Sequence, residues 1–198
     1  MHKVDQRHSE EMASVHNASI EFDTLDGALR SGDENTIIQE LRRAKTQKSS
    51  ELVAKVAQIL TETDSARIRN AAAVALADMN AREKADVILQ LLTERKTQSS
   101  RGTLLFALEQ MGAKIPLKIL AEIILTDSYE ARQEALGLIK AQQTTFTQAE
   151  LRGGEKVIRE SLSSLTSERF DTAQAALKIL SGAGDLNARK GARKNKTF

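Results

Sequence analysis

The sequence predicts an all-α fold in which about five pairs of helices stack side by side. From Phe22 onward, apolar residues recur at spacings of three and four, which is the periodicity of amphipathic helices. Only 3% of the residues are aromatic, the sequence contains a single proline, and Ala and Leu fill most apolar positions. This composition favours closely packed helices over sheets. A helical motif also returns at intervals of about 30 residues, as expected when one helix pair is repeated.

The predicted elements are ten short helices that follow a polar N-terminal segment. Residues 1–19 contain only scattered apolar positions, so we expect the N-terminal segment, residues 1–21, to form a mobile arm or a loosely docked helix. We predict a helical repeat domain over 22–184 and a basic tail over 185–198. Polar breaks group the helices into pairs: 22–30 with 34–46, 49–62 with 65–79, 83–95 with 98–111, 115–126 with 128–140, and 150–165 with 167–181.

Glycine and asparagine mark the predicted C-termini of several helices. After an apolar helical segment, a residue that readily adopts the left-handed conformation ends the helix. Four positions fit this description: Gly32, Asn80, Gly112 and Gly182.

Capping residues mark the predicted starts of other helices. Pro116 stands where a first helical turn tolerates the missing N–H group. Asp127 with Glu130, and Thr147 with Glu150, have the spacing of a capping box, which places an acceptor and a carboxylate over unpaired backbone N–H groups. We therefore expect helices to begin close to these residues.

The repeated motif lies in the second helix of each pair. Residues 68–79 read IRNAAAVALADM, and the arginine and the apolar positions return 32 residues later and again after a further 31. One helix pair cannot bury its own apolar face, so stacking of successive pairs would complete the core. The matching positions are Arg69, Ala72, Ala75, Leu76 and Met79, then Arg101, Leu104, Ala107, Leu108 and Met111, then Arg132, Ala135, Leu138 and Ile139.

An apolar helix, an aspartate in the turn and then this motif together resemble the HEAT repeat, closely over 51–79 and recognisably over 115–140. The resemblance implies a right-handed α-α superhelix, a HEAT-like solenoid of about five helix pairs. In that family the turn aspartate and the second-helix arginine typically form a ladder along the stack. Lys96 replaces the acid before Arg101, which interrupts the pattern there. The residues that match the ladder are Asp64, Arg69, Arg101, Asp127 and Arg132.

The side of the second helices that faces away from the core is the predicted binding surface. With the arginine and the apolar motif positions inward, about 100° per residue places Val74 and Phe106 on one outward stripe. In HEAT-like stacks this face lines the concave surface, so we expect Phe106 to anchor a partner protein. The sequence is equally consistent with Phe106 packing beneath a neighbouring helix. The predicted partner-binding residues are Arg67, Asn70, Val74, Asp78, Phe106, Gln110, Glu130 and Gln133.

The net charge of +2 is unevenly distributed along the chain. The tail over 185–198 has five basic residues against Asp185, a net charge of +4, so the remainder sums to −2. A slightly acidic body with a basic end is not a nucleic-acid-binding face. Binding of nucleic acid through the tail remains an alternative, although no aromatic residue is interleaved with its basic residues, Arg189, Lys190, Arg193, Lys194 and Lys196.

The sequence contains no recognisable catalytic, cofactor-binding or metal-binding motif. It lacks a glycine-rich phosphate loop, a nucleophile elbow and cysteine, and its three histidines all fall in the N-terminal arm. Repetition of arginine at one structural position favours a structural role over anion binding. Two classes of HEAT-like enzyme are the alternatives, bilin lyases and DNA glycosylases that remove alkylated bases. The absence of tryptophan argues against the aromatic, basic groove of a glycosylase.

The sequence therefore predicts a non-catalytic module that holds another protein in the concave groove. By analogy of fold, such a module can serve as a bacterial adaptor or as an immunity protein that neutralises a toxin. The absence of cysteine fits a reducing compartment, and the first residues lack the apolar core of a signal peptide. The longest apolar run, residues 71–77, is too short to span a bilayer, so we expect a cytoplasmic protein without membrane contact.

Overall fold

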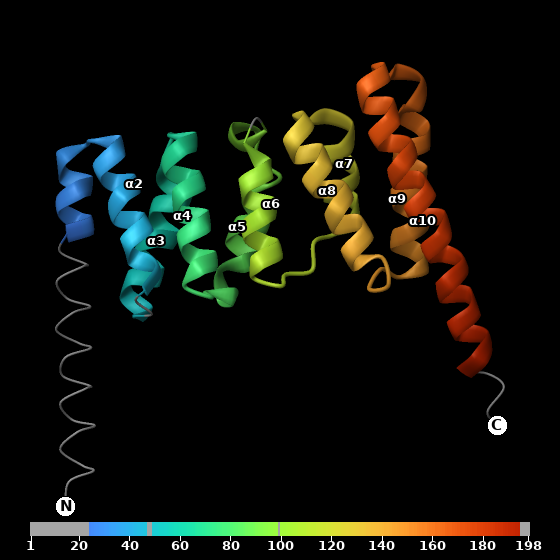
Figure 1. Cartoon of the computed structure of the whole chain (residues 1–198), viewed down its shortest axis with the longest axis horizontal. Coiled ribbons are helices and arrows are strands. Elements are labelled where there is room, and N and C mark those ends of the chain that lie inside the picture. The colour runs from blue at the N-terminus through green and yellow to red at the C-terminus, as the bar shows by residue number, and fades with distance from the viewer. Residues whose placement is uncertain (1–23, 47–48, 99, 195–198) are drawn as a thin grey trace, which may run out of the picture. The chain divides into compact units, whose positions relative to one another are not determined.

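The computed structural model describes the backbone of residues 24–46, 49–98 and 100–194, and the side chains of 24–45, 49–98 and 100–183. Within these residues every regular element is a helix (Figure 1), which confirms the predicted all-α class. None of the helices in this part of the chain is long and apolar enough to cross a membrane. The predicted N-terminal arm, with His2, His8 and His16, lies outside the described residues.

The described helices fall close to the predicted segments, with differences of a few residues at most ends. The last helix deviates most, since it ends at Lys194 and not near 181. In the third pair the first helix is shortened to seven residues between two single 3-10 turns, Arg82–Lys84 and Arg95–Thr97. The helices are a segment over 24–31, α2 (Glu34–Arg43), α3 (Ser50–Glu62), α4 (Ala66–Asp78), α5 (Ala85–Leu91), α6 (Arg101–Gln110), α7 (Leu117–Thr126), α8 (Tyr129–Gln142), α9 (Gln148–Ser161) and α10 (Ser167–Lys194).

The chain divides into two compact units, residues 1–87 and residues 88–198. In the first unit α3 packs against α4, and α2 packs against α4. In the second unit α7 packs against α8 and α9 against α10, while the second helices α6, α8 and α10 contact one another in order. Short turns make the helices of a pair antiparallel. Each unit is therefore built from sequential helix pairs, with second helices side by side.

The core of each unit consists of aliphatic side chains at helical spacing. In the first unit Leu52, Leu60 and Leu76 are fully buried, and alanines of α4 are buried beside them. In the second unit Leu104 and Leu108 of α6 are fully buried together with leucine and isoleucine side chains of α7 and α8. Alanine at the contact points lets second helices approach closely, which explains the alanine-rich motif.

Three of the four predicted helix ends are confirmed. Gly32, Asn80 and Gly112 have φ angles of 69°, 55° and 67°, the left-handed conformation expected at a helix C-terminus. The prediction that Gly182 ends its helix is wrong, because α10 continues to Lys194. No later helix follows α10 in the described chain, so no chain reversal is required there, and a glycine inside a helix costs only about 1 kcal/mol. The predicted tail thus begins within α10.

Helices begin close to both predicted capping boxes, as expected, but the capping box itself forms at only one of them. At α9, Thr147 accepts the Glu150 N–H, and the Glu150 carboxylate accepts the Thr147 N–H. At α8, however, Ser128 is the N-cap and accepts the Ala131 N–H, while Asp127 ends α7. A serine already in the extended N-cap conformation supplies the acceptor, which leaves the Asp127 carboxylate available for another partner.

Candidate functional site

The arginine of the repeated motif is withdrawn from solvent in all three second helices. Arg69 and Arg132 are buried, and 11% of the Arg101 side chain is exposed. Each guanidinium group reaches back to the turn that precedes its own helix, where carbonyl groups at the end of the first helix lack helical partners. The repeated position therefore corresponds to a repeated structural role.

Arg69 contacts backbone rather than a carboxylate. Its Nη2 atom donates to the carbonyl oxygens of Thr63 at 2.8 Å and Asp64 at 3.3 Å, at the end of α3. The Asp64 side chain is exposed, and no ion pair involves it within the described residues. A cation at the C-terminal end of a helix is favourable, so Arg69 stabilises the α3–α4 turn inside its own pair.

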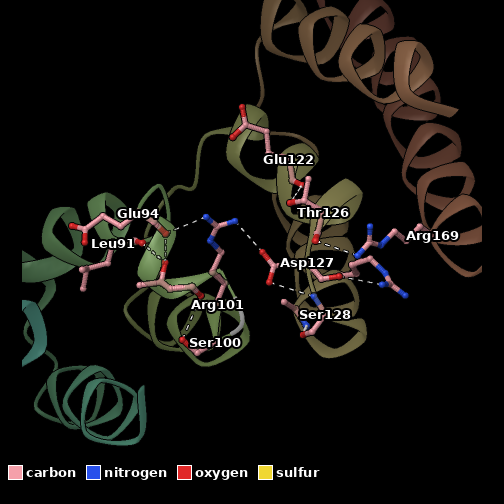
Figure 2. A network of polar contacts seen from close by, with 12 residues as sticks. Leu91, Glu94, Ser100, Arg101, Glu122, Thr126, Asp127, Ser128 and Arg169 are labelled. Atoms are coloured by element: carbon pink, nitrogen blue, oxygen red, sulfur yellow. Dashed lines mark hydrogen bonds and ion pairs between the residues drawn. The ribbon is translucent and has the colours of Figure 1, made fainter. Parts of the chain in front are cut away.

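Arg101 links its helix to the next pair (Figure 2). Its Nη1 atom donates to Asp127 Oδ2 at 2.9 Å, and its Nη2 atom donates to the Glu94 carbonyl oxygen at 3.3 Å. The Asp127 side chain is fully buried and also accepts the Ser128 N–H at 3.3 Å. The acid that pairs with Arg101 thus comes from the following α7–α8 turn, and Lys96 in its own turn does not prevent the contact.

Arg132 extends the network to the last helix. Its Nη1 atom donates to the Asp127 carbonyl oxygen at 3.2 Å, and its Nη2 atom forms an ion pair with the Glu168 carboxylate of α10. Its guanidinium carbon lies 5.8 Å from the centre of the Tyr129 ring, within cation-π range. From α10, Arg169 donates to the Thr126 carbonyl oxygen (Figure 2). The end of α7 is therefore held from α6, α8 and α10.

The electrostatics of this network reflect burial. Removal from water raises the pKa of the Asp127 carboxyl above its ordinary value, and the Arg101 guanidinium offsets only part of that effect. Each of the three arginines has one buried nitrogen without a hydrogen-bond partner in the described part of the chain. It is the Nε atom of Arg69, Arg101 and Arg132. The remaining contacts of the guanidinium groups are made to the protein itself, so the arrangement orders the turns.

Three of the four predicted partner-binding residues of α4 are engaged by other residues or partly covered. Arg67 forms an ion pair with Glu34 and donates to Asn35 Oδ1 at 3.0 Å, so it joins α4 to α2. Asn70 and Val74 are half-buried, and Asp78 is exposed. In the first unit, these residues offer little uncovered apolar surface.

The predicted partner-binding residues of α6 and α8 are more exposed to solvent than those of α4. Phe106, in the middle of α6, is 42% exposed, and Gln110 at the end of that helix is exposed. Glu130 and Gln133 are exposed on α8, which packs against α6. Val74 belongs to the first compact unit and Phe106 to the second, so each residue lies on the surface of its own unit.

Sequence reasoning missed Glu109 on α6, three residues after Phe106, and Glu134 on α8. Burial raises the pKa of Glu134 on α8, and the Glu109 carboxyl group on α6 raises it further through charge repulsion and a hydrogen bond. Each residue alone resembles an ordinary charged helical position. Their juxtaposition depends on the offset between two neighbouring helices, which a single sequence does not specify. Tyr129, 55% exposed, was also missed.

The surface of α6 and α8 around Phe106 is assigned no role by a metal site or by similarity to other proteins. In the part of the chain that the structure describes, no group of three His, Asp or Glu side chains is placed to hold a metal ion. Comparison of the chain with protein-family models, with curated proteins and with solved structures gives no match.

Proposed function

We propose that the chain is a HEAT-like repeat protein, a right-handed solenoid that binds a partner protein without catalysing a reaction. Three features support this proposal: helices packed in sequential pairs, second helices that contact one another in order, and an arginine at a repeated position. The Arg101–Asp127 ion pair between successive pairs matches the ladder expected from the resemblance. An adaptor or an immunity protein would fit this architecture, by analogy of fold alone.

The observation that carries the binding proposal is the exposure of Phe106. A phenylalanine in the middle of a helix that leaves 42% of its surface in water forgoes part of the free energy that burial would supply. Exposed aromatic side chains surrounded by polar groups are typical anchors of protein interfaces. Gln110, Glu130 and Gln133 supply the polar groups on α6 and α8.

Replacement of Phe106 by glutamate tests this function. The tagged variant is compared with the unchanged chain in affinity capture from the native source, followed by mass spectrometry. We expect the captured partner to be lost, while the far-UV circular dichroism and the melting temperature stay nearly unchanged, because Phe106 contributes little to the core. The matched control is Ala149→Glu, an exposed position on α9 that acquires the same charge. A Phe106→Glu variant that unfolds, or that retains the partner, would reject the interface role.

A further inference from the structure

The C-terminal part of α10 extends beyond the helices that pack against its N-terminal part. α10 has 28 residues, whereas its neighbours α8 and α9 have 14 each. At a rise of about 1.5 Å per residue, α10 is longer than either neighbour by about 20 Å. Figure 1 shows its last turns running past the ends of α8 and α9. These turns therefore project from the packed body of the second unit.

The sequence of α10 changes where the helix leaves its neighbours. Up to Ala183 the helix has one buried stripe, formed by Thr172, Ala173, Ala176, Leu177, Leu180 and Ala183. At about 100° per residue, positions 187, 190, 191 and 194 continue that stripe. These four positions are Asn, Lys, Gly and Lys, so the sequence supplies no apolar side chain that could extend the core.

The projecting turns carry a dense positive charge. Arg189, Lys190, Arg193 and Lys194 occur within six residues, and the sequence contains no acidic residue after Asp185. Helical geometry places these four basic positions within an arc of about 140°. Like charges four residues apart, at 189 with 193 and at 190 with 194, destabilise a helix, and bound anions would remove their repulsion. The end of α10 therefore favours a ligand that presents several negative charges.

The composition of residues 184–194 distinguishes between classes of polyanion. A helix that lies in an anionic membrane needs large apolar side chains on one face, and an interface with an acidic protein needs apolar anchors. Residues 184–194 contain one large apolar residue, Leu186, and no aromatic residue. Contact with nucleic-acid phosphates requires charge alone, whereas single strands are also held by stacking on aromatic side chains. The composition therefore favours a nucleic-acid duplex.

A helix as the binding element favours DNA over RNA. The major groove of B-form DNA is about 12 Å wide and admits an α-helix, which is about 10 to 12 Å across. The major groove of an RNA duplex is too deep and narrow for side chains to read. Residues 1–184 carry a net charge of −2, so electrostatic attraction to phosphates is confined to the end of the chain.

We propose that the last turns of α10, residues 184–194, bind the phosphates of double-stranded DNA without sequence specificity. The positive charges come from Arg189, Lys190, Arg193 and Lys194. Charge complementarity, the projection of the helix and the lack of apolar anchors support this occupant. The proposal goes beyond the function proposed for the Phe106 surface, which lies on α6.

A titration of labelled DNA tests this proposal. The full chain is added to a fluorescent duplex of about 20 base pairs, and anisotropy is measured at several NaCl concentrations from about 50 to about 200 mM. We expect binding that weakens with salt, with a slope of log K against log salt of about −3.6 for four phosphate contacts. The double variant Lys190→Gln with Lys194→Gln should reduce the slope to about −1.8 and weaken binding at about 50 mM NaCl by at least about tenfold.

A matched variant controls for net charge. Lys140 on α8 and Lys178 in the packed part of α10 are both exposed. The variant Lys140→Gln with Lys178→Gln loses the same two charges away from the projecting turns, so it should keep its affinity within about twofold. An equal loss in this control, or an unchanged affinity in the Lys190→Gln, Lys194→Gln variant, overturns the proposal.

Two further variants separate charge from folding. Arg189→Gln with Arg193→Gln should reduce the slope as much as the lysine pair does, because it removes the same number of phosphate contacts. Lys190→Arg with Lys194→Arg retains both charges and should bind DNA within about twofold of the unchanged chain. Far-UV circular dichroism and the melting temperature should stay the same in all of them, since the positions lie beyond the core. DNA binding that depends on one residue pair alone contradicts the proposed role of the other.

Competitors identify the class of polyanion. Unlabelled duplex DNA is compared with duplex RNA, single-stranded DNA, poly-glutamate and vesicles that contain phosphatidylserine, and we expect duplex DNA to compete best. Stronger competition by any of the others overturns the assignment to duplex DNA, and absence of duplex binding at about 50 mM NaCl overturns the proposal as a whole. Phe106→Glu should retain DNA binding, so failure of one proposal is distinguishable from failure of the other.

Discussion

At Asp127 the cost of burying a carboxylate is set against one charged hydrogen bond to Arg101. The side chain is fully buried, and the raised pKa shows that desolvation exceeds the stabilisation from the guanidinium group. A buried pair of this kind contributes little net stability compared with apolar residues of the same volume, but removal of one partner leaves the other charge buried alone. The contact therefore selects the arrangement of α6 beside the α7–α8 turn more than it adds free energy.

We predict that Asp127→Ala lowers the free energy of unfolding by about 3 kcal/mol, because Arg101 loses its counter-ion in a site with little access to water. The double variant Arg101→Met with Asp127→Leu should be more stable than Asp127→Ala, since both charges are removed together. Urea unfolding monitored by circular dichroism measures the free energy of unfolding of the single and the double variant. As a control, Glu122→Ala breaks the exposed pair with Lys118 and should change stability by less than about 0.5 kcal/mol. A small loss in Asp127→Ala, similar to this control, would contradict the prediction.

The Glu134 carboxyl group makes the folded state less stable at neutral pH than at low pH. A carboxylate stabilised by an ion pair has the opposite effect. The pKa of Glu134 in the folded chain is raised above the ordinary value of 4.5, so the folded state binds the proton more tightly than the unfolded state does. This residue therefore disfavours folding at pH 7, and the penalty disappears as the pH falls through its raised pKa towards 4.5.

We predict that Glu134→Gln raises the free energy of unfolding at pH 7 by about 0.3 kcal/mol, because it removes the cost of partly burying a charge and the repulsion by Glu109 at a partly exposed site. Near pH 4 the wild-type carboxyl group is protonated, so the two proteins should be equally stable. Urea unfolding at both pH values checks the difference, with Glu160→Gln as the comparison. A gain of the same size at both pH values would show that charge is not its source.

The sequence predicts the arginines of this network but not all of their partners. A repeat of 32 and 31 residues identifies Arg69, Arg101 and Arg132 as equivalent, and burial of all three follows from that equivalence. Whether an arginine binds a turn carbonyl, as Arg69 does, or a carboxylate of the next pair, as Arg101 does, depends on the spacing between pairs. That spacing is a property of packed helices and is not contained in a local pattern.

At the scale of the element, α9 carries two adjacent glycines in different surroundings. A Cβ atom at Gly154 would lie 2.8 Å from Cγ and Cδ2 of Leu117, which is buried where α7 packs against α9. A Cβ atom at Gly153 would meet no heavy atom within 4 Å, and this residue is exposed. One glycine therefore permits close approach of two helices, whereas the other only weakens its helix.

We predict opposite effects of alanine at these two positions. Gly154→Ala should lower the free energy of unfolding by about 1 to 3 kcal/mol, because the buried Leu117 side chain must shift to admit the methyl group. Gly153→Ala should raise it by about 0.5 to 1 kcal/mol through better helix propensity. Urea unfolding of the two variants side by side gives the measurement. Changes of the same sign would refute the assignment of the close contact to Gly154.

Element boundaries could be predicted from the sequence where a turn is required. Gly32, Asn80 and Gly112 precede a chain reversal and adopt the left-handed conformation, so their local chemistry and the topology agree. Gly182 has the same local chemistry, but α10 passes through it because no reversal follows in the described chain. A glycine is thus a reliable helix end only where the next element must fold back.

At the scale of the whole chain, packing is dominated by neighbours in sequence. Within each compact unit, helices contact their pair partner and helices of nearby pairs, and the most distant partners are α7 and α10. If the fold is the proposed solenoid, its stability is approximately a sum of the stabilities of individual helix pairs and of the contacts between neighbouring pairs. A local defect should therefore weaken the elements around it more than those in the other unit.

Hydrogen exchange of Gly154→Ala tests this property. We expect backbone amides of α7, α9 and α10 to exchange faster than in the unchanged chain, because α9 packs against both other helices. Amides of α3 and α4, which belong to the other compact unit, should keep their exchange rates within about twofold. Exchange measured by mass spectrometry at peptide resolution, under conditions where both proteins remain folded, gives the comparison. Equal acceleration in α3 and α4 would mean that the chain opens as one cooperative unit, because amides that exchange only by global unfolding all report the same loss of free energy.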